Sequence, residues 1–388
     1  MLNKVYQKAK LENITNQYKK ADEALLKKAN EEAAEIAEKL DLDDKICKYR
    51  EADAFMTTKD TKENFVSKPS WRLLNPSKTE IGVISKQILS RTCQTIRNLT
   101  GINQWVSTND VVSWFNGIEE KHRRHFIKFD ICAFYPSITM ILLKTSLEFA
   151  KNYVEISEDD IKIIMNSRKT FLFSNNQIWI KKSESDTNFD IPMGSFDGAE
   201  CSELVGLFMI DQMVTKNLIA KEDGGLYRDD GAIAVKGNGP TLDRLRKNLV
   251  GLFKQNGLDI DSDIEISKRI NYLDIIMDLT TGHVEPYRKP NDVITYVHAK
   301  SNHPPAIIKQ IPKTVQDRLS NISSNKEIFE AAVTPYQTAL NNAGYKSKLK
   351  YEPRPSTGTK KGKRNQRKIL YFNPQYSKNV VTNVDKTV

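Results

Sequence analysis

Two adjacent acidic residues between two apolar runs constrain the fold more than any other feature of the sequence. The stretch Leu226–Gly231 reads Leu-Tyr-Arg-Asp-Asp-Gly and is followed by Ala-Ile-Ala-Val. Neighbouring side chains of a strand point to opposite faces, so Asp229 and Asp230 converge only where the chain turns. Because an Asp-Gly pair between strand-like runs is a strong hairpin signal, the pattern predicts a β-hairpin with both acids at its tip. Two like charges this close need a cation between them, which predicts a metal site.

An Asp-Asp-Gly turn on its own marks a solvent-exposed hairpin tip more often than a site, so a second acidic segment decides the interpretation. Residues 126–138 read Phe-Ile-Lys-Phe-Asp-Ile-Cys-Ala-Phe-Tyr-Pro-Ser-Ile. The apolar residues at 127, 129 and 131 alternate as the buried face of a strand, which turns Asp130 to the opposite side, toward a cleft. Tyr135 follows near the end of the strand, where the proline after it stops regular pairing.

The composition favours a nucleic-acid partner and excludes several other classes. A net charge of +10 and a pI near 9.1 suggest a polyanionic partner, and 388 residues allow two or three domains. The four cysteines are scattered without CxxC spacing, which argues against a structural zinc site and suits a reducing compartment. No apolar run reaches the length of a membrane span, and the N-terminus lacks a signal-peptide pattern, so we expect neither a membrane partner nor secretion.

Hydrophobic periodicity predicts a mixture of helices and hairpins. The expected elements are an amphipathic helix over 15–40, a basic hairpin over 55–74, helices near 84, over 105–122 and over 138–154, a hairpin over 171–180, helices after 198 and over 241–255, a hairpin over 270–290, and paired helices over 303–343. Lys59 and Arg72 lie on the basic hairpin, where they would either grip a triphosphate or act as solubilising charge. Gly194 would let backbone approach a ligand closely, although a plain turn explains it equally well. From 352 onward Pro, Gly, Lys and Arg are typical of a linker or of disorder.

Asp130, the glycine turn at Gly194 and the hairpin with Asp229 and Asp230 follow one another in the order of a polymerase palm. Nucleotidyl transfer uses two divalent ions, one that lowers the pKa of the attacking 3′ hydroxyl and one that holds the triphosphate and leaving group. Such ions need carboxylate ligands from different chain segments. Asp130 and Asp229 are about a hundred residues apart, so only a sheet that places their strands side by side would unite them.

On these motifs the chain resembles the reverse transcriptases of retroelements, most closely the Penelope-like group. The resemblance covers roughly residues 54–322. Its carriers are Phe-Asp-Ile-Cys-Ala-Phe-Tyr-Pro-Ser-Ile (129–138), Pro-Met-Gly-Ser (192–195), Tyr-Arg-Asp-Asp (227–230), Tyr-Leu-Asp-Ile (272–275), Tyr-Arg-Lys-Pro (287–290) and Ser-Asn-His-Pro (301–304). The last three motifs point to Penelope-like elements rather than to retroviral enzymes.

The resemblance implies a right-hand polymerase of the α+β class, with fingers, a palm built on an antiparallel sheet, and a helical thumb. Its parts would be an N-terminal helical region (1–50), fingers (51–122), a palm with an inserted hairpin (123–290), a helical thumb (291–350) and a basic linker or disordered tail (351–388). The implied activity is that of an RNA-directed DNA polymerase, a nucleotidyltransferase that extends a primer 3′ hydroxyl with deoxynucleoside triphosphates.

The resemblance also implies roles for individual residues. The ligands of two Mg²⁺ or Mn²⁺ ions would be Asp130, Asp229, Asp230 (in a weaker role) and the carbonyl of Ile131. The nucleotide-binding residues would be Lys59 and Arg72 on the triphosphate, Tyr135 as the ring that excludes a 2′ hydroxyl, and Gly194 under the nascent base pair. Lys268 would be a general acid for the departing pyrophosphate, and the primer grip would begin with Tyr272, Leu273 and Asp274.

The sequence departs from the family pattern at three points. Met193 precedes the motif glycine where many reverse transcriptases have Gln, Arg228 stands where small or apolar residues are common, and no GIY-YIG endonuclease is readable. We expect an RNA template and a DNA primer as partners, with the nuclease of many Penelope-like elements missing from this chain. The basic patch at Lys360–Arg364 suggests the nucleus, with the cytoplasm as the alternative.

Two other interpretations stay open on the sequence. Asp followed by Tyr-Pro-Ser-Ile also occurs in family B DNA polymerases, although these carry Asp-Thr-Asp in the later motif and lack the Met-Gly-Ser turn. The non-enzymatic alternative is a truncated or domesticated retroelement protein that binds RNA without catalysis.

Overall fold

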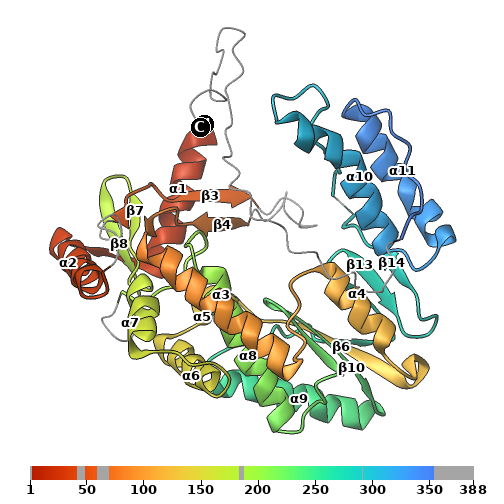
Figure 1. Cartoon of the computed structure of the whole chain (residues 1–388), viewed down its shortest axis with the longest axis horizontal. Helices are drawn as coiled ribbons and strands as arrows, with labels where there is room; N and C mark the ends of the chain where they lie inside the picture. The colour runs from red at the N-terminus through yellow and green to blue at the C-terminus, as the bar shows by residue number, and fades with distance from the viewer. Residues whose placement is uncertain (1, 42–48, 59–69, 183–187, 291, 354–388) are drawn as a thin grey trace. The chain divides into compact units, whose positions relative to one another are not determined.

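The computed structural model describes residues 2–41, 49–58, 70–182, 188–290 and 292–353, which fold into helices and antiparallel strands as predicted (Figure 1). The chain divides into two compact units. The first holds the chain up to Ser107 together with Ile118–Ile270, and the second holds Thr108–Gly117 together with the chain from Asn271 onward. None of the helices in these described ranges combines the length and the apolar composition of a membrane span. The basic patch at Lys360–Arg364 lies outside the described residues.

A four-stranded antiparallel sheet forms the centre of the first unit. Its strands, in order across the sheet, are β11 (Glu265–Ser267), β6 (Arg124–Asp130), β10 (Asp230–Lys236) and β9 (Gly224–Tyr227). The register of β6 and β10 pairs Asp130 with Asp230, and Phe129 with Gly231. Directly opposed residues of an antiparallel pair share a face, so the two acids lie on one face of the sheet and the Phe–Gly pair on the other.

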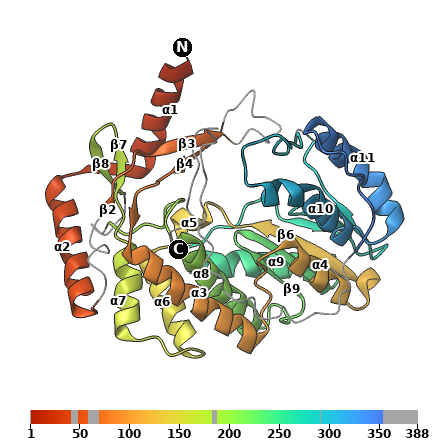
Figure 2. The ribbon, with the colours of Figure 1, turned by 45° about the horizontal axis from the view of Figure 1, so that its top comes forward.

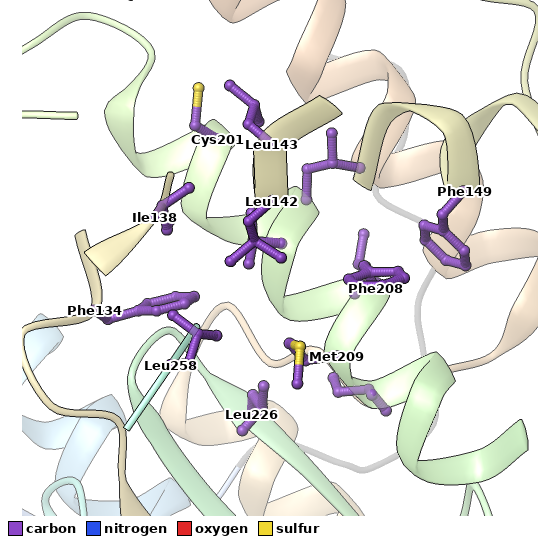
Figure 3. Close-up of a cluster of buried hydrophobic side chains, with 14 of the residues drawn as sticks. Phe134, Ile138, Leu142, Leu143, Phe149, Cys201, Phe208, Met209, Leu226 and Leu258 are labelled. Atoms are coloured by element: carbon purple, nitrogen blue, oxygen red, sulfur yellow. The ribbon is translucent and has the colours of Figure 1, made fainter. Parts of the chain in front are cut away.

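One hydrophobic core joins this sheet to helices that include α3 (Ile81–Thr100), α6 (Met140–Lys151), α8 (Gly198–Thr215) and α9 (Gly239–Gln255). Residues all around α8 are buried, as expected for a helix that is apolar on every side. Figure 3 shows Phe208 and Met209 of α8 gathered with Leu142 of α6 and Leu226 of β9. This core fixes the sheet on which the candidate site is built.

Gly231 is required by the packing of the core against β10. A Cβ atom there would lie 2.3 to 2.6 Å from ring atoms of Phe129, whose ring packs edge-on against that of Phe253 with centroids 5.6 Å apart. We expect Gly231→Ala to lower the free energy of unfolding by about 2 kcal/mol, because the buried ring has no room to yield. Gly251→Ala in α9 is the matched control, since a Cβ there meets nothing within 4 Å, and it should be neutral or stabilising. Urea unfolding followed by circular dichroism measures both, and equal stability of the two variants would contradict the packing argument.

The N-terminal segment is not the single helix predicted over 15–40, and that prediction is wrong. Helix α1 (Leu2–Gln17) is followed by strand β1 (Tyr18–Ala21) and then by helix α2 (Glu23–Lys39). Strand β1 pairs antiparallel with β8 (Gln177–Lys181), which pairs in turn with β7 (Leu172–Ser174). The helix is interrupted because a distant strand offers β1 a partner, and because the Asp22 side chain caps α2 by accepting a hydrogen bond from the N–H of Leu25.

Both hairpins predicted before the glycine turn are confirmed. Strand β3 (Phe55–Thr58) pairs with β4 (Trp71–Leu74), and β7 pairs with β8 across Asn175 and Asn176. The φ values of these two asparagines, 53° and 57°, are those that a two-residue hairpin turn needs. Helix α1 lies beside the β3–β4 hairpin (Figure 1, Figure 2), where the N–H of Met56 donates to the hydroxyl oxygen of Tyr6 over 2.9 Å. The remaining elements of this unit are β2 (Tyr49–Arg50), β5 (Lys78–Thr79), η2 (Lys121–Arg123), α5 (Phe134–Ser137) and α7 (Glu158–Ser167).

The second unit combines helices with a small antiparallel sheet. Its elements are α4 (Thr108–Gly117), the end of strand β12 (Arg269–Tyr272) from Asn271 onward, the strands β13 (Ile275–Asp278) and β14 (Val284–Pro286), and helices α10 (Pro305–Asn321) and α11 (Lys326–Asn342). The two helices share a core around Leu319, Phe329 and Leu340, which confirms the helix pair predicted over 303–343. Strand β14 is joined to the turn between these helices. There Val284 and Ser324 exchange hydrogen bonds of 2.6 and 3.0 Å.

Candidate active site

The two acidic segments meet at one end of the central sheet. Asp130 is the last residue of β6, and Asp230, its partner in register, is the first residue of β10. The N–H of Ile131 donates to the carbonyl oxygen of Asp229 over 2.9 Å, which fastens the hairpin to the end of β6. Asp130 is exposed between the buried residues Phe129 and Ile131, as the alternation predicted. The sheet therefore makes neighbours of two acidic segments that are far apart in the sequence.

The hairpin turn lies one residue earlier than predicted, so the two acids do not share its tip. The tip consists of Arg228 and Asp229, and Asp230 is already part of the ladder of β10. Arg228 has a φ of 56° and takes the left-handed position that the Asp-Gly pair was expected to supply. Gly231 is instead needed inside β10, where the ring of Phe129 leaves no room for a side chain.

A cavity of about 640 Å³ lies over this end of the sheet, within the first unit. The predicted site residues that line it are Arg72, Asp130, Ile131, Tyr135, Gly194 and Asp229. Asp230 is adjacent in the ladder but is not among the lining residues, and Lys59 lies outside the part of the chain that the structure describes. The fold thus gathers most of the predicted nucleotide site into one cavity.

The β3–β4 hairpin and the glycine turn reach the cavity through a direct backbone connection. Asn75, just after β4, donates its N–H to the carbonyl oxygen of Met193 over 2.9 Å. Gly194 has a φ of 114°, and a Cβ atom there would lie 2.4 Å from the carbonyl oxygen of Asn75. Glycine is therefore required both by the backbone angle and by the close approach of a second backbone segment. Arg72 of β4, which is exposed, is carried to the cavity by the same connection.

Tyr135 lies on a strained one-turn segment between β6 and α6. It belongs to α5, and Ala133, the residue that caps this turn, has a φ of 45°. A non-glycine residue in this region costs about 1–3 kcal/mol, and such strain clusters at functional sites. Phe134 is buried next to Tyr135, with ring centroids 6.3 Å apart in an edge-on arrangement, so the tyrosine rests on the core while it lines the cavity.

Negative charge is concentrated at this end of the sheet. Burial raises the pKa of the Cys132 thiol, and the charges of Asp261, Asp130 and Asp259 raise it further. The segment with Asp259 and Asp261 runs along the end of β6. The N–H of Cys132 donates to the carbonyl of Asp259 (2.8 Å), and the N–H of Asp261 donates to the carbonyl of Asp130 (2.9 Å). The field that disfavours a thiolate here favours a divalent cation.

The oxygen donors of the cavity fit Mg²⁺ that binds together with a substrate. Across the residues that the structure describes, no group of three or more His, Cys, Asp or Glu side chains forms a preformed metal cage. Mg²⁺ usually takes one or two carboxylates and completes its shell with waters and substrate phosphates. Asp130, Asp229 and the backbone at Ile131 supply hard oxygen donors of this kind and number.

Lys268 lies away from these acids, and the structure does not support its prediction as a general acid. Its ammonium donates to the carbonyl oxygens of His122 (2.8 Å) and Arg124 (2.5 Å). Arg124 and Asp130 are the two ends of β6. At about 3.3 Å per residue these ends are roughly 20 Å apart. Lys268 therefore binds the Arg124 end of β6 and is not part of the proposed site.

The predicted primer grip forms the turn between β12 and β13 in the second unit. Tyr272 is 1% exposed and belongs to the core, and Leu273 has a φ of 53°. Asp274 accepts hydrogen bonds from Nε and Nη2 of Arg318 (3.0 and 2.6 Å) and from the hydroxyl of Thr108 (2.5 Å). The side chains of Tyr272 and Asp274 thus make their contacts inside this unit, and contact with a primer stays a prediction.

The cavity also contains residues that the sequence did not single out. They are Asn13 and Gln17 of α1, Tyr18 of β1, Lys181 of β8 and Asp190. Asp190 lies two residues before the Pro-Met-Gly-Ser motif, and no motif surrounds the other four. The pairing of β1 with β8 places Tyr18 opposite Lys181, and this long-range pairing is not readable from the sequence.

The chain has a reverse-transcriptase-like polymerase fold. Among solved structures the chain is similar to telomerase from Candida albicans in complex with the TWJ fragment of telomeric RNA. That similarity has a TM-score of 0.55 at 9% identity, over 88% of this chain and 57% of that one. The chain is also similar to the RNA-dependent RNA polymerase of a human picobirnavirus (TM-score 0.48, 12% identity, 71% and 55% of the two chains). A third similar structure is apo telomerase from Candida tropicalis truncated from its C-terminal domain (TM-score 0.43, 15% identity, 52% and 44%).

These comparisons show the fold but do not assign the chain to a group of polymerases such as the Penelope-like group. The chain spans 44% to 57% of the length of the three structures. A family model described as the animal helix-turn-helix domain matches residues 295–352, which contain α10 and α11. No curated protein matches the sequence. The likeness to the Candida albicans telomerase, which covers most of this chain, is what shows the polymerase-like fold.

Proposed function

We propose that the chain is an RNA-directed DNA polymerase that extends a primer 3′ hydroxyl by two-metal nucleotidyl transfer. The observation that carries the proposal is that Asp130 and Asp229, from two distant segments, line one cavity together with Arg72 and Tyr135. The fold shared with a telomerase supports it. The net charge of +10 suits a template and a primer whose phosphates repel each other.

The predicted site residues have roles that their chemistry allows. Asp130 and Asp229, with the Ile131 carbonyl, would hold the divalent ions, whose chemistry is to activate the primer hydroxyl and to neutralise the triphosphate. Arg72 would bind the triphosphate through charge-assisted hydrogen bonds. Tyr135 would lie beneath the incoming sugar and exclude a 2′ hydroxyl by its bulk. Asp230, in the ladder beside these acids, would act mainly through its charge.

We further propose that the chain comes from a Penelope-like retroelement. The support is the set of motifs that follow the acidic hairpin, Tyr-Leu-Asp-Ile (272–275), Tyr-Arg-Lys-Pro (287–290) and Ser-Asn-His-Pro (301–304). The last of these lies within the segment that matches the animal helix-turn-helix domain. On this proposal the partners are an RNA template, a DNA primer and deoxynucleoside triphosphates, in the nucleus or the cytoplasm.

Primer extension on an RNA template tests the proposed activity. With a DNA primer, deoxynucleoside triphosphates and Mg²⁺, we expect stepwise extension that EDTA abolishes and excess Mg²⁺ restores, because the carboxylates act through the ions. A strict preference for a DNA template would instead favour a DNA-dependent polymerase. RNA binding that weakens steeply with salt, without incorporation at any metal concentration, would show a nucleic-acid-binding protein without catalysis.

A further inference from the structure

A chain of polar contacts connects the N-terminal strand to the segment that carries Tyr135. The ammonium of Lys181 donates to the carbonyl oxygen of Pro136 over 2.5 Å and lies 3.1 Å from Oδ1 of Asp190. The hydroxyl of Tyr18 donates to the other oxygen, Oδ2, of the same carboxylate over 2.8 Å. All of these residues line the cavity.

The carboxylate at the centre of this network is shielded from solvent. Asp190 is 2% exposed, and its Oδ1 also accepts the N–H of Ile191 over 2.9 Å. Burial and the neighbouring charge of Asp190 raise the pKa of the Tyr18 hydroxyl, so this group stays a neutral donor. A buried carboxylate is costly without a cation, and Lys181, whose side chain is 19% exposed, supplies one. The ammonium therefore has a fixed place, from which it reaches Pro136.

The contact with Pro136 acts on the residue directly after Tyr135. On one side of this tyrosine, Ala133 is in a strained backbone conformation with a φ of 45°. On the other side, the ammonium of Lys181 holds the carbonyl of Pro136. A strained segment persists only while its surroundings hold it, so loss of the ammonium would let the turn relax and the ring of Tyr135 shift.

We propose that Lys181 is a positioning residue that keeps Tyr135 in place beneath the incoming sugar and thereby sets the preference for deoxynucleotides over ribonucleotides. This inference rests on the proposed polymerase function. It gives the N-terminal strand a part in substrate selection, because β1 pairs with the strand that carries Lys181, and Tyr18 bonds the carboxylate that holds its ammonium.

The test compares kcat/KM for a deoxynucleotide with that for the matching ribonucleotide. Lys181→Met is expected to lower this ratio by about tenfold, mainly through faster use of the ribonucleotide. Lys182→Met is the matched control, since the ammonium of Lys182 also donates to a backbone carbonyl, but to that of Thr15 in α1 (2.6 Å). The control should keep the wild-type ratio, and Lys181→Arg should keep most of it. If Lys181→Met does not fold, Asp190→Asn removes the charge that holds the ammonium and is measured in its place.

A double-mutant cycle separates positioning from a general loss of structure. If Lys181 acts through Tyr135, Lys181→Met should have no further effect on the ratio once Tyr135 is replaced by alanine. An unchanged ratio in a folded Lys181→Met variant, or the same drop with and without the tyrosine, would overturn the inference while leaving the polymerase proposal intact. If the wild type incorporates neither nucleotide, the polymerase proposal fails first and the inference falls with it.

Discussion

The Asp229→Asn variant is expected to fold like the wild type and to incorporate nucleotides about a thousandfold more slowly, which corresponds to roughly 4 kcal/mol of activation free energy. Asparagine has the size of aspartate but brings no negative charge to a divalent ion, so the proposed activation of the primer hydroxyl is lost. The fold should survive because the bond that ties the hairpin to β6 uses the main-chain carbonyl of Asp229, which accepts the N–H of Ile131. Single-turnover primer extension with Mg²⁺ measures the rate, and thermal unfolding verifies the fold.

Two further acids provide graded controls for this variant. Asp230→Asn changes an acid in the same ladder that does not line the cavity, so we expect a smaller loss than for Asp229→Asn. Asp243→Asn changes an acid on α9 that bonds to Arg246 and Lys247, and it should leave the rate unchanged. A rate for Asp229→Asn close to that of the wild type would rule out the proposed site, even if primer extension itself were observed.

The pairing of the two acidic segments was predictable from one local pattern together with the order of the motifs. The alternation of apolar residues around Asp130 fixes which face of β6 is buried, and the motif order implies that a second acidic hairpin pairs with that strand. The structure places Asp130 opposite Asp230 in this pairing. The two helices over 303–343 were predictable from local signals alone, because a helical stripe needs only the nearest turns of its own chain.

Features that depend on long-range packing were not predictable from the sequence. The Asp-Gly pair after Asp229 is typical of a hairpin turn, yet Gly231 lies inside β10 because it faces the buried ring of Phe129. Strand β1 interrupts a helical pattern because β8 is available to pair with it, and β8 follows more than a hundred residues later. Lys268 follows the acidic hairpin in the sequence, but β11 pairs with β6 in a register that carries it to the Arg124 end.

The Asp197→Ala variant is expected to lose about 3–5 kcal/mol of unfolding free energy, the largest stability effect that the structure predicts. Asp197 forms an ion pair with Arg168, and these two residues are 0% and 1% exposed. Its Oδ2 also accepts the hydroxyls of Ser85 (2.5 Å) and Ser167 (2.7 Å). Removal of the carboxylate would leave a buried guanidinium and two buried hydroxyls without this partner. The free-energy cost of that loss is much larger than the net stabilisation that the intact ion pair provides.

The same ion pair links stability to the candidate site. Asp197 stands between the turn at Gly194 and the first residue of α8, and its partners come from α3 and from the end of α7. Guanidinium chloride unfolding measures the loss, with Asp243→Ala as the control, since the ion pairs of this exposed acid are screened by solvent and contribute little to stability. A loss of less than about 1 kcal/mol for Asp197→Ala would mean that solvent reaches the guanidinium of Arg168 and that the pair is not essential to the fold. If the expected loss is found, the glycine turn depends on a buried charge pair, and the position of Gly194 in the cavity is set by α3 and α7 as well as by the sheet.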